Sequence, residues 1–166
     1  SRFRRESSLE ADRAQAHIDH MSQFAIPTSW DALTVLRDED IPLFWAALVV
    51  ARDEYPDLDV SAYEARCVAL ERELRSRLPD QAEPQEQIAA INRFLFEEKG
   101  FAGNQQDYYD PRNSYLNDVL DRRLGIPLSL GLIQLELARR LGVPLEGVSF
   151  PGHFLVRLPV DGGLLV

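Results

Sequence analysis

The sequence predicts an α+β domain, in which a helical part is followed by a small antiparallel sheet. Two observations lead to this prediction. Apolar residues recur at helical spacing over the first two thirds of the 166-residue chain. Short strand-like segments then follow the last helix, and Asp161-Gly162, a dipeptide typical of tight hairpin turns, separates the final two. Helices and strands that are segregated along a chain are typical of α+β domains.

Residues 1–100 are expected to be mainly helical. One short helix is predicted over residues 6–21, and a second begins after Thr28-Ser29, whose hydroxyl groups accept hydrogen bonds from free backbone N–H groups. Pro42 fits the first turn of a third helix, which continues to Arg52. Apolar side chains cover most of the circumference of this third helix, which predicts that it is deeply buried.

The fourth predicted helix carries the only cysteine of the chain. This helix begins at Asp59 or Ser61, and its apolar spacing places Cys67 on the face toward the core. Acidic residues surround Cys67 in the sequence, whereas a nucleophilic cysteine needs an electropositive and partly exposed setting, so we interpret it as a structural thiol. A fifth helix begins at Glu83-Pro84 and ends at Gly100.

Residues 101–166 contain a polar loop, two further helices and the strands. Asn113-Ser114 is expected to cap a short helix that continues to Arg123. A longer helix follows over residues 128–141, and Gly142 ends it. Strands are predicted over residues 145–150 and 153–158 and from Gly163 onward.

Length and charge restrict the organisation and the partners of the chain. A hydrophobic fraction of 45% is enough for one substantial core, so residues 1–166 are expected to form a single domain. The chain begins without methionine and stops inside a predicted strand, and we therefore expect a fragment of a longer chain. With 27 acidic and 18 basic residues, the net charge of −9 repels phosphate backbones and anionic lipid, so neither nucleic acid nor a membrane is expected as partner.

Cysteine and histidine usage gives no sign of a disulfide or a metal. One cysteine cannot form an internal disulfide, which favours the reducing cytoplasm. The longest apolar run, residues 41–51, is shorter than the roughly 20 residues that a membrane-crossing helix needs. His17 and His20 lie one turn apart near acidic residues, but no Cys/His signature completes a metal site, and a solvated helix face is the preferred interpretation. We expect no metal and no cofactor.

The candidate catalytic residues are Ser129 and His153. Ser129 lies in the first turn of a predicted helix, where backbone N–H groups favour a nucleophile and a developing oxyanion. His153 lies on a strand that follows, which suits a general base, although the chain ends before a third residue is visible. The alternative is structural: Ser129 is then an ordinary helix cap, and His153 a core histidine bonded to a carbonyl or a loop residue.

The polar loop before the last two helices supplies candidate cleft residues. Its amide, carboxylate and hydroxyl side chains either line a binding cleft or bond their own backbone in a well-ordered connector, and we weigh the two interpretations equally. The candidates are Asn104, Asp107, Tyr108, Asn113 and Ser114.

Residues 91–157 contain a set of short motifs that are specific when taken together. They are Gly103-Asn104, Asn113-Ser114-Tyr115-Leu116, Leu124-Gly125-Ile126-Pro127, Ala138-Arg139-Arg140-Leu141-Gly142 and Pro151-Gly152-His153-Phe154. With these motifs the chain resembles the transglutaminase-like superfamily, and in particular its bacterial subgroup labelled invasion-gene regulators. The upstream helices resemble the subgroup too, so the match covers most of the chain.

This resemblance implies a papain-like core with a central helix packed on a small antiparallel sheet. In such a core a cysteine opens the central helix, and a histidine and an aspartate occupy neighbouring strands. His153 corresponds to the histidine, but the cysteine position falls on Ser129 or near Pro127, and neither is cysteine. Proteins of the subgroup often continue into a tetratricopeptide-type repeat, which this chain lacks.

Three functional hypotheses follow. The preferred one is a non-catalytic transglutaminase-like module, a pseudoenzyme that binds a protein or peptide partner in a regulatory role, because a histidine is present without its cysteine. The second is an acyl-transfer or hydrolytic enzyme that uses Ser129 and His153 with an acid beyond the end of the chain. The third is a structural amino-terminal half for a repeat domain.

Overall fold

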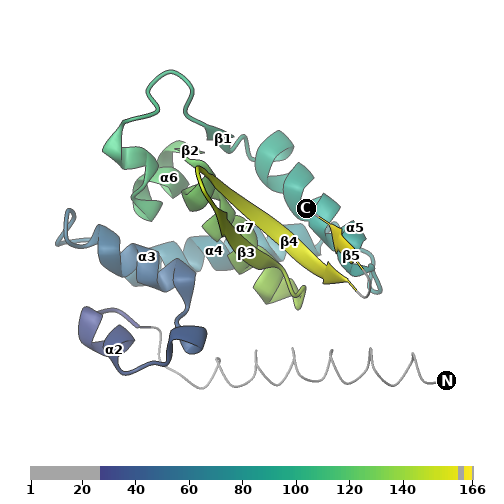
Figure 1. The fold of residues 1–166 in the computed structure, drawn as a ribbon, viewed down its shortest axis with the longest axis horizontal. Coiled ribbons are helices and arrows are strands. Elements are labelled where there is room, and N and C mark those ends of the chain that lie inside the picture. Colours follow the sequence, from purple (N-terminus) through teal and green to yellow (C-terminus); the bar gives the residue numbers. More distant parts are fainter. Residues whose placement is uncertain (1–26, 161–162, 166) are drawn as a thin grey trace.

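The computed structural model describes residues 27–160 and 163–165 and shows a chain rich in helices, with two small sheets (Figure 1). The helices are α2 (Trp30–Thr34), α3 (Leu43–Ala51), α4 (Val60–Arg75), α5 (Pro84–Asn92), α6 (Leu116–Arg122) and α7 (Pro127–Leu141). Shorter helical turns are η1 (Asp38–Asp40), η2 (Arg93–Glu98) and η3 (Pro111–Asn113). The strands are β1 (Ala102–Gly103), β2 (Leu124–Gly125), β3 (Glu146–Phe150), β4 (His153–Val160) and β5 (Gly163–Leu165).

The strands form two separate ladders. β1 pairs with β2 in parallel, while β3, β4 and β5 form an antiparallel sheet in sequence order. The predicted order of helices followed by antiparallel strands is therefore confirmed, whereas the short parallel ladder was not predicted. The predicted helix over residues 6–21 and the predicted turn at Asp161-Gly162 lie outside the described residues.

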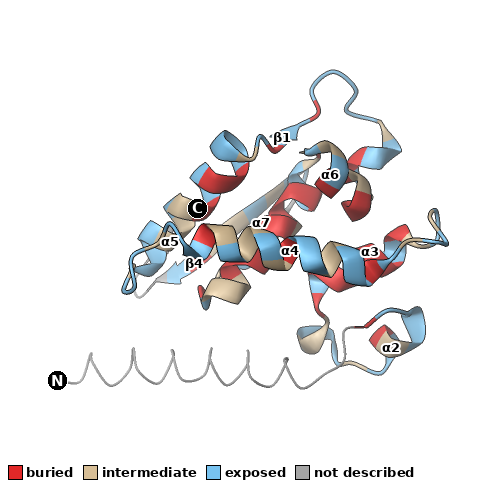
Figure 2. Cartoon of the chain, turned by 180° about the vertical axis from the view of Figure 1, so that it is seen from behind, coloured by how far each residue is buried: buried red, intermediate tan, exposed pale blue. Residues whose placement is uncertain are grey.

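Helix α7 lies at the centre of the fold. It contacts α3, α4, α5 and α6, and on another side the strands β3 and β4 (Figures 1 and 2). Pro127 stands at its first helical position, and Gly142, with φ of 76°, ends it in the left-handed conformation that glycine adopts without strain. Leucine, isoleucine and alanine side chains along the helix are buried, among them Ile133, Leu137 and Ala138. A helix surrounded in this way needs apolar residues on most of its circumference.

The β3–β4 hairpin lies on α7 through one aromatic ring. The ring of Phe154 fills the space above Gly131, where an added Cβ would come within 2.4 Å of it, and above Gly147 on β3, where the separation would be 2.9 Å. Side chains alternate between the two faces of a strand, so the neighbours of Phe154 in β4 face away from α7. Consistent with this alternation, His153 is exposed and Leu155 is 40% exposed.

Helices α3, α4 and α7 are joined by a cluster of charges around Arg140. Its guanidinium group donates to Glu64 at 2.8 Å, to Glu71 at 3.2 Å and to Glu136 at 2.6 Å. The guanidinium carbons of Arg139 and Arg140 each lie 5.5 Å from the centre of the Trp45 ring. The cluster thus links the amino-terminal helices to the carboxyl-terminal half of α7.

Two of the predicted local features differ from the structure. Helix α3 was expected to be deeply buried, but Leu43 and Val50 at its two ends are 55% and 44% exposed. Asn113-Ser114 was expected to cap α6, but the N-cap is Tyr115, and the Asn113 amide instead donates to carbonyls of the preceding loop. Helix α6 ends at Arg123, whose φ of 61° supplies the left-handed turn that is more often made by glycine.

Replacing Gly131 by alanine is expected to destabilise the domain. Alanine normally favours a helix by about 1 kcal/mol over glycine. The new methyl group, however, would collide with the Phe154 ring, so we expect a net loss of about 1–3 kcal/mol in the free energy of unfolding, measured by urea denaturation. Gly103→Ala is the control, because nothing lies within 4 Å of its added Cβ. A Gly131→Ala variant more stable than the parent would contradict the close contact.

Candidate functional site

The hydroxyl group of Ser129 is buried and bonded to backbone. Ser129 is only 3% exposed, and its Oγ donates to the carbonyl oxygen of Asn113 at 2.7 Å. The same Oγ accepts from the N–H of Ile126 at 3.0 Å, and the Ile126 carbonyl lies 3.1 Å away. These contacts close the first turn of α7 and attach it to η3. Ser129 is therefore not the N-cap, which is Ile126, but it stabilises the helix start from the third helical position, as the last residue of a capping box does.

His153 is at the other side of the hairpin from this hydroxyl. It is the first residue of β4 and pairs with Phe150 across the turn at Pro151-Gly152. Because Phe154 faces α7, the alternation of side chains directs His153 to the opposite, exposed face. The structure therefore does not bring the two sequence-predicted catalytic residues into the hydrogen-bonded pair that nucleophilic catalysis by serine needs.

The loop candidates form one network with Ser129. Asn104 and Asn113 are 8% and 0% exposed, and the Asn104 amide donates to Asn113 Oδ1 at 3.1 Å. Asn104 Oδ1 accepts from the N–H of Asp107 at 3.1 Å, and Asn113 Nδ2 donates to the carbonyls of Asp107 and Tyr108 at 2.8 and 3.2 Å. The buried amides thus hold the loop backbone from inside. The remaining candidates, Tyr108, Ser114 and the side chain of Asp107, are exposed.

Cys67 lies in the core, as the helical spacing predicted. It is 0% exposed, and burial raises the pKa of its thiol to about 12. Nearby Glu136 and Glu64 raise the pKa further, while Arg140 opposes them. A thiol in this state holds its proton at neutral pH, and the described structure offers no sulfur nucleophile in its place.

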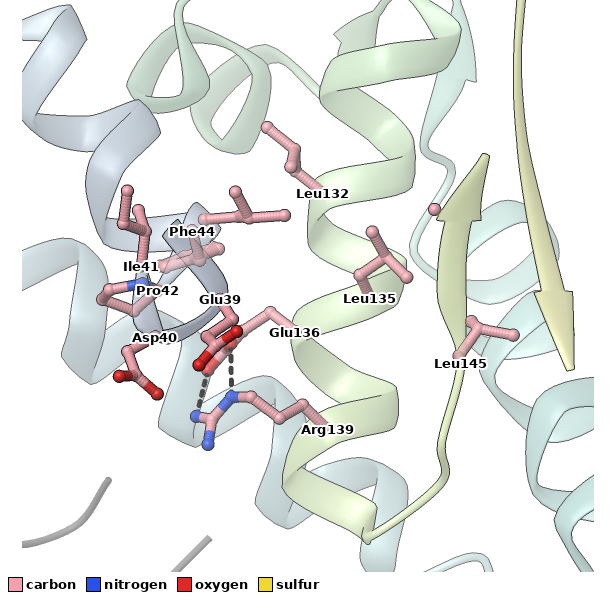
Figure 3. A pocket seen from close by; sticks show the side chains of 12 residues that line it. Glu39, Asp40, Ile41, Pro42, Phe44, Leu132, Leu135, Glu136, Arg139 and Leu145 are labelled. Carbon is pink, nitrogen blue, oxygen red and sulfur yellow. Dashed lines mark hydrogen bonds and ion pairs between the residues drawn. The ribbon is translucent and has the colours of Figure 1, made fainter. Parts of the chain in front are cut away.

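A cleft that the sequence did not reveal opens between the amino-terminal helices and α7 (Figure 3). Its volume is about 200 Å³. Aliphatic and aromatic side chains form its walls, and the charged side chains lie at one end, where Arg139 donates to Glu136 at 2.9 and 2.7 Å. The lining residues are Glu39, Asp40, Ile41, Pro42, Leu43, Phe44, Leu132, Leu135, Glu136, Arg139, Leu145 and Gly147.

This cleft is separate from the predicted site residues, since neither the catalytic candidates nor the polar loop lines it. Its walls come from residues 39–44, 132–139 and 145–147, which are distant in the sequence. The only signal for it was the apolar character of α3 and of Leu132 and Leu135, which also suits core residues. Hydrophobic spacing alone does not distinguish the wall of a cleft from a core.

The described part of the chain shows neither a metal-binding cluster nor a membrane-spanning helix. No group of three or more His, Cys, Asp or Glu residues within it is arranged to hold a metal ion. None of its helices combines the length and the apolar character that crossing a bilayer requires.

The described residues form a helix-rich fold with small sheets, in which the Ser129 hydroxyl is bonded to backbone and His153 is exposed at the hairpin turn. The chain belongs to the transglutaminase-like superfamily, whose model matches residues 61–166. Among its relatives is a UPF0162 protein of Xylella fastidiosa strain 9a5c, which is 53% identical over 146 residues, or 88% of this chain and 52% of the relative. The chain therefore spans about half the length of this relative.

More distant relatives include proteins of other lengths. A UPF0162 protein of Vibrio cholerae is 40% identical over 91 residues, which are 55% of this chain and 34% of that protein. F-box only protein 21 of Mus musculus is 45% identical over 103 residues, which are 62% of this chain and only 15% of that protein. No solved structure matches the chain.

Removing the Ser129 hydroxyl is expected to cost stability. In Ser129→Ala the Asn113 carbonyl and the Ile126 N–H lose a buried partner, so the free energy of unfolding should fall by about 1–3 kcal/mol in urea denaturation. Ser114→Ala, at an exposed serine 15 residues earlier in the sequence, should change it by less than about 0.5 kcal/mol. Equal effects of the two substitutions would contradict a structural role for the Ser129 hydroxyl.

The raised pKa of Cys67 predicts a loss of stability at high pH. The unfolded thiol ionises near pH 9.0, whereas the folded thiol keeps its proton to about pH 12, so the unfolded state binds fewer protons between these values and stability falls as pH rises through them. Urea denaturation between pH 7 and 11 should show this decline. The decline in stability should be smaller in Cys67→Ala. In that variant Tyr55 and Tyr63, whose pKa values are also raised to about 12, still contribute to it. An identical pH profile for the variant would contradict the prediction.

Proposed function

We propose that this protein is a non-catalytic transglutaminase-like module that binds a segment of a protein partner and acts in regulation. The observation that carries the proposal is the state of Ser129, whose buried hydroxyl donates to the Asn113 carbonyl while His153 lies exposed on the far face of the hairpin. A serine nucleophile needs an accessible hydroxyl and a histidine within hydrogen-bond reach. Neither condition is met by this pair.

We also propose that the fold is a variant of the papain-like core of transglutaminases. The position of α7 under the β3–β4 hairpin is consistent with a central helix packed on a small antiparallel sheet, as in that core. The narrower kinship with the invasion-gene regulators is part of the same proposal and is supported by the motifs around Asn113 and His153. According to this proposal the protein keeps the fold of a cysteine-dependent enzyme but has no catalytic thiolate, and the Phe154 ring fills the space over α7.

The cleft between η1, α3 and α7 is the proposed binding place. Its walls are mainly apolar, and a volume of about 200 Å³ is enough for one large apolar side chain, though small for a whole cofactor. An apolar anchor residue in a concave, desolvated site is the usual source of affinity in peptide recognition. Charged side chains border one end of the cleft, where Arg139 bonds Glu136.

The occurrence of the domain in different proteins supports a binding module. A related stretch makes up about a third of the Vibrio cholerae protein but 15% of the mouse F-box only protein 21. Related domains therefore occur as one part of longer proteins that differ in the rest of their sequence. A portable part of this kind is typical of modules that recognise a partner, and we apply that interpretation to this chain.

The absence of catalysis can be tested directly. Purified protein is incubated with thioester, ester, amide and isopeptide substrates, and we expect no turnover above buffer. Turnover that disappears in both Ser129→Ala and His153→Ala, while circular dichroism shows both variants to be folded, would overturn the non-catalytic part of the proposal.

Binding in the cleft can be tested with matched leucines of the same helix. A panel of acetylated nonapeptides that differ only in a central Phe, Leu or Gln is titrated by fluorescence anisotropy. We expect the Phe and Leu peptides to bind more tightly than the Gln peptide, and Leu135→Asn to remove this preference because Leu135 lines the cleft. Leu128→Asn is the control, since Leu128 is 48% exposed and is not among the lining residues. Equal loss in both variants, or no preference in the parent, would refute the cleft as the binding place.

A further inference from the structure

Two adjacent tyrosines project from the loop between β1 and η3. Tyr108 is 58% exposed and Tyr109 is 91% exposed. Their rings meet edge to face, with centroids 5.5 Å apart and planes at 89°. Neither residue lines the cleft described above, so the pair, here called the tyrosine ledge, is a separate surface.

The backbone under the tyrosine ledge is held rigidly from the core. Asn113 Nδ2 donates to the Tyr108 carbonyl at 3.2 Å and to the Asp107 carbonyl at 2.8 Å. Asn104 accepts from the Asp107 N–H, and Asn113 in turn accepts the Ser129 hydroxyl. The loop that carries the ledge is therefore anchored to α7 and is an ordered part of the domain.

This anchoring is an unusual use of buried polar groups. Burying the amides of Asn104 and Asn113 is favourable only if their hydrogen-bonding groups are satisfied, and they are satisfied mainly by each other and by this loop. The loop tip contributes no buried side chain between Gln105 and Tyr109. The network therefore holds exposed side chains in a fixed position. Tyrosines held in this way are efficient binding residues, because little side-chain entropy is lost when they contact a partner.

The charges around the ledge favour a cationic partner. Asp107 is exposed and forms no ion pair within the described residues. The nearby cations Arg112 and Arg122 are both paired with Asp110, at 2.8 and 3.1 Å. The whole chain carries a charge of −9. Aromatic faces attract guanidinium and ammonium groups, and a neighbouring carboxylate strengthens that attraction.

We propose that the tyrosine ledge, with Asp107 beside it, docks an arginine- or lysine-bearing segment of a protein partner. The cationic side chain lies against the face of Tyr109, and the exposed amides of Gln105 and Gln106 bond the backbone of the segment. This surface is additional to the proposed cleft, and it is independent of whether the cleft binds an apolar anchor.

The probe for this surface is a fluorescein-labelled nonapeptide of alternating glycine and arginine. Peptides with glutamine or glutamate in place of arginine are the comparison, and binding to the full chain is followed by anisotropy. Tyr109→Ala should weaken binding of the arginine peptide about fivefold, Tyr109→Phe should leave it within about twofold, and Tyr109→Leu should behave like Tyr109→Ala because it keeps apolar area but has no aromatic face. The variants should fold normally, since the side chain is exposed, and circular dichroism checks this.

A matched charge control separates the ledge from the general acidity of the chain. Asp107→Asn should weaken binding of the arginine peptide, whereas Asp80→Asn, which removes the same charge from the exposed loop between α4 and α5, should not. Full binding by Tyr109→Leu would overturn the cationic partner in favour of an apolar one. Equal effects of the two aspartate substitutions, or binding of a single-stranded oligonucleotide that depends on Tyr109, would also overturn the proposal. Leu135→Asn should not affect this peptide, so failure here is distinguishable from failure of the cleft.

Discussion

The hydrogen bond from the Ser129 hydroxyl to the Asn113 carbonyl connects three parts of the molecule, which are helix α7, η3 and the loop before η3. On one side it completes the first turn of α7, the helix that all of the core surrounds. On the other side it holds η3, and through the Asn113 amide it fixes the loop before η3. The same bond gives the Ser129 hydroxyl a structural role. A hydroxyl that donates to a buried carbonyl is not free to react with a substrate.

The two ends of α7 are held by different chemistry. Neutral hydroxyl and amide groups satisfy the amino-terminal end, whereas the Arg140 cluster with Glu64, Glu71 and Glu136 holds the carboxyl-terminal end against α3 and α4. Glu136 is 5% exposed, and removing one member of such a buried cluster leaves an uncompensated charge. Glu136 and Arg139, which bonds it, also line the cleft, so charged side chains as well as apolar ones form its wall.

The elements that the sequence predicted well are those whose ends are marked by local chemistry. Pro127 and Gly142 bound α7, Asp59 caps α4, and the Pro151-Gly152 turn separates β3 from β4. The start of α6 was mispredicted because the Asn113 side chain has two possible uses, and tertiary contacts favoured the loop over the helix cap. The cleft was missed because segments that are distant in the chain form it.

The candidate catalytic pair was predicted from the order of Ser129 and His153 in the sequence. That order places His153 on a strand after the helix, but it does not determine which face of the strand carries the His153 side chain. A one-residue change in the register of β4 against α7 would turn His153 inward and Phe154 outward. Gly131 and Gly147 oppose that change, because the absence of their side chains creates the space that the Phe154 ring fills. Exposing this ring would cost roughly 1.5–3 kcal/mol of apolar burial and would leave a void above α7. The two glycines were visible in the sequence, and together with Phe154 they are the features that determine which face of β4 meets the helix.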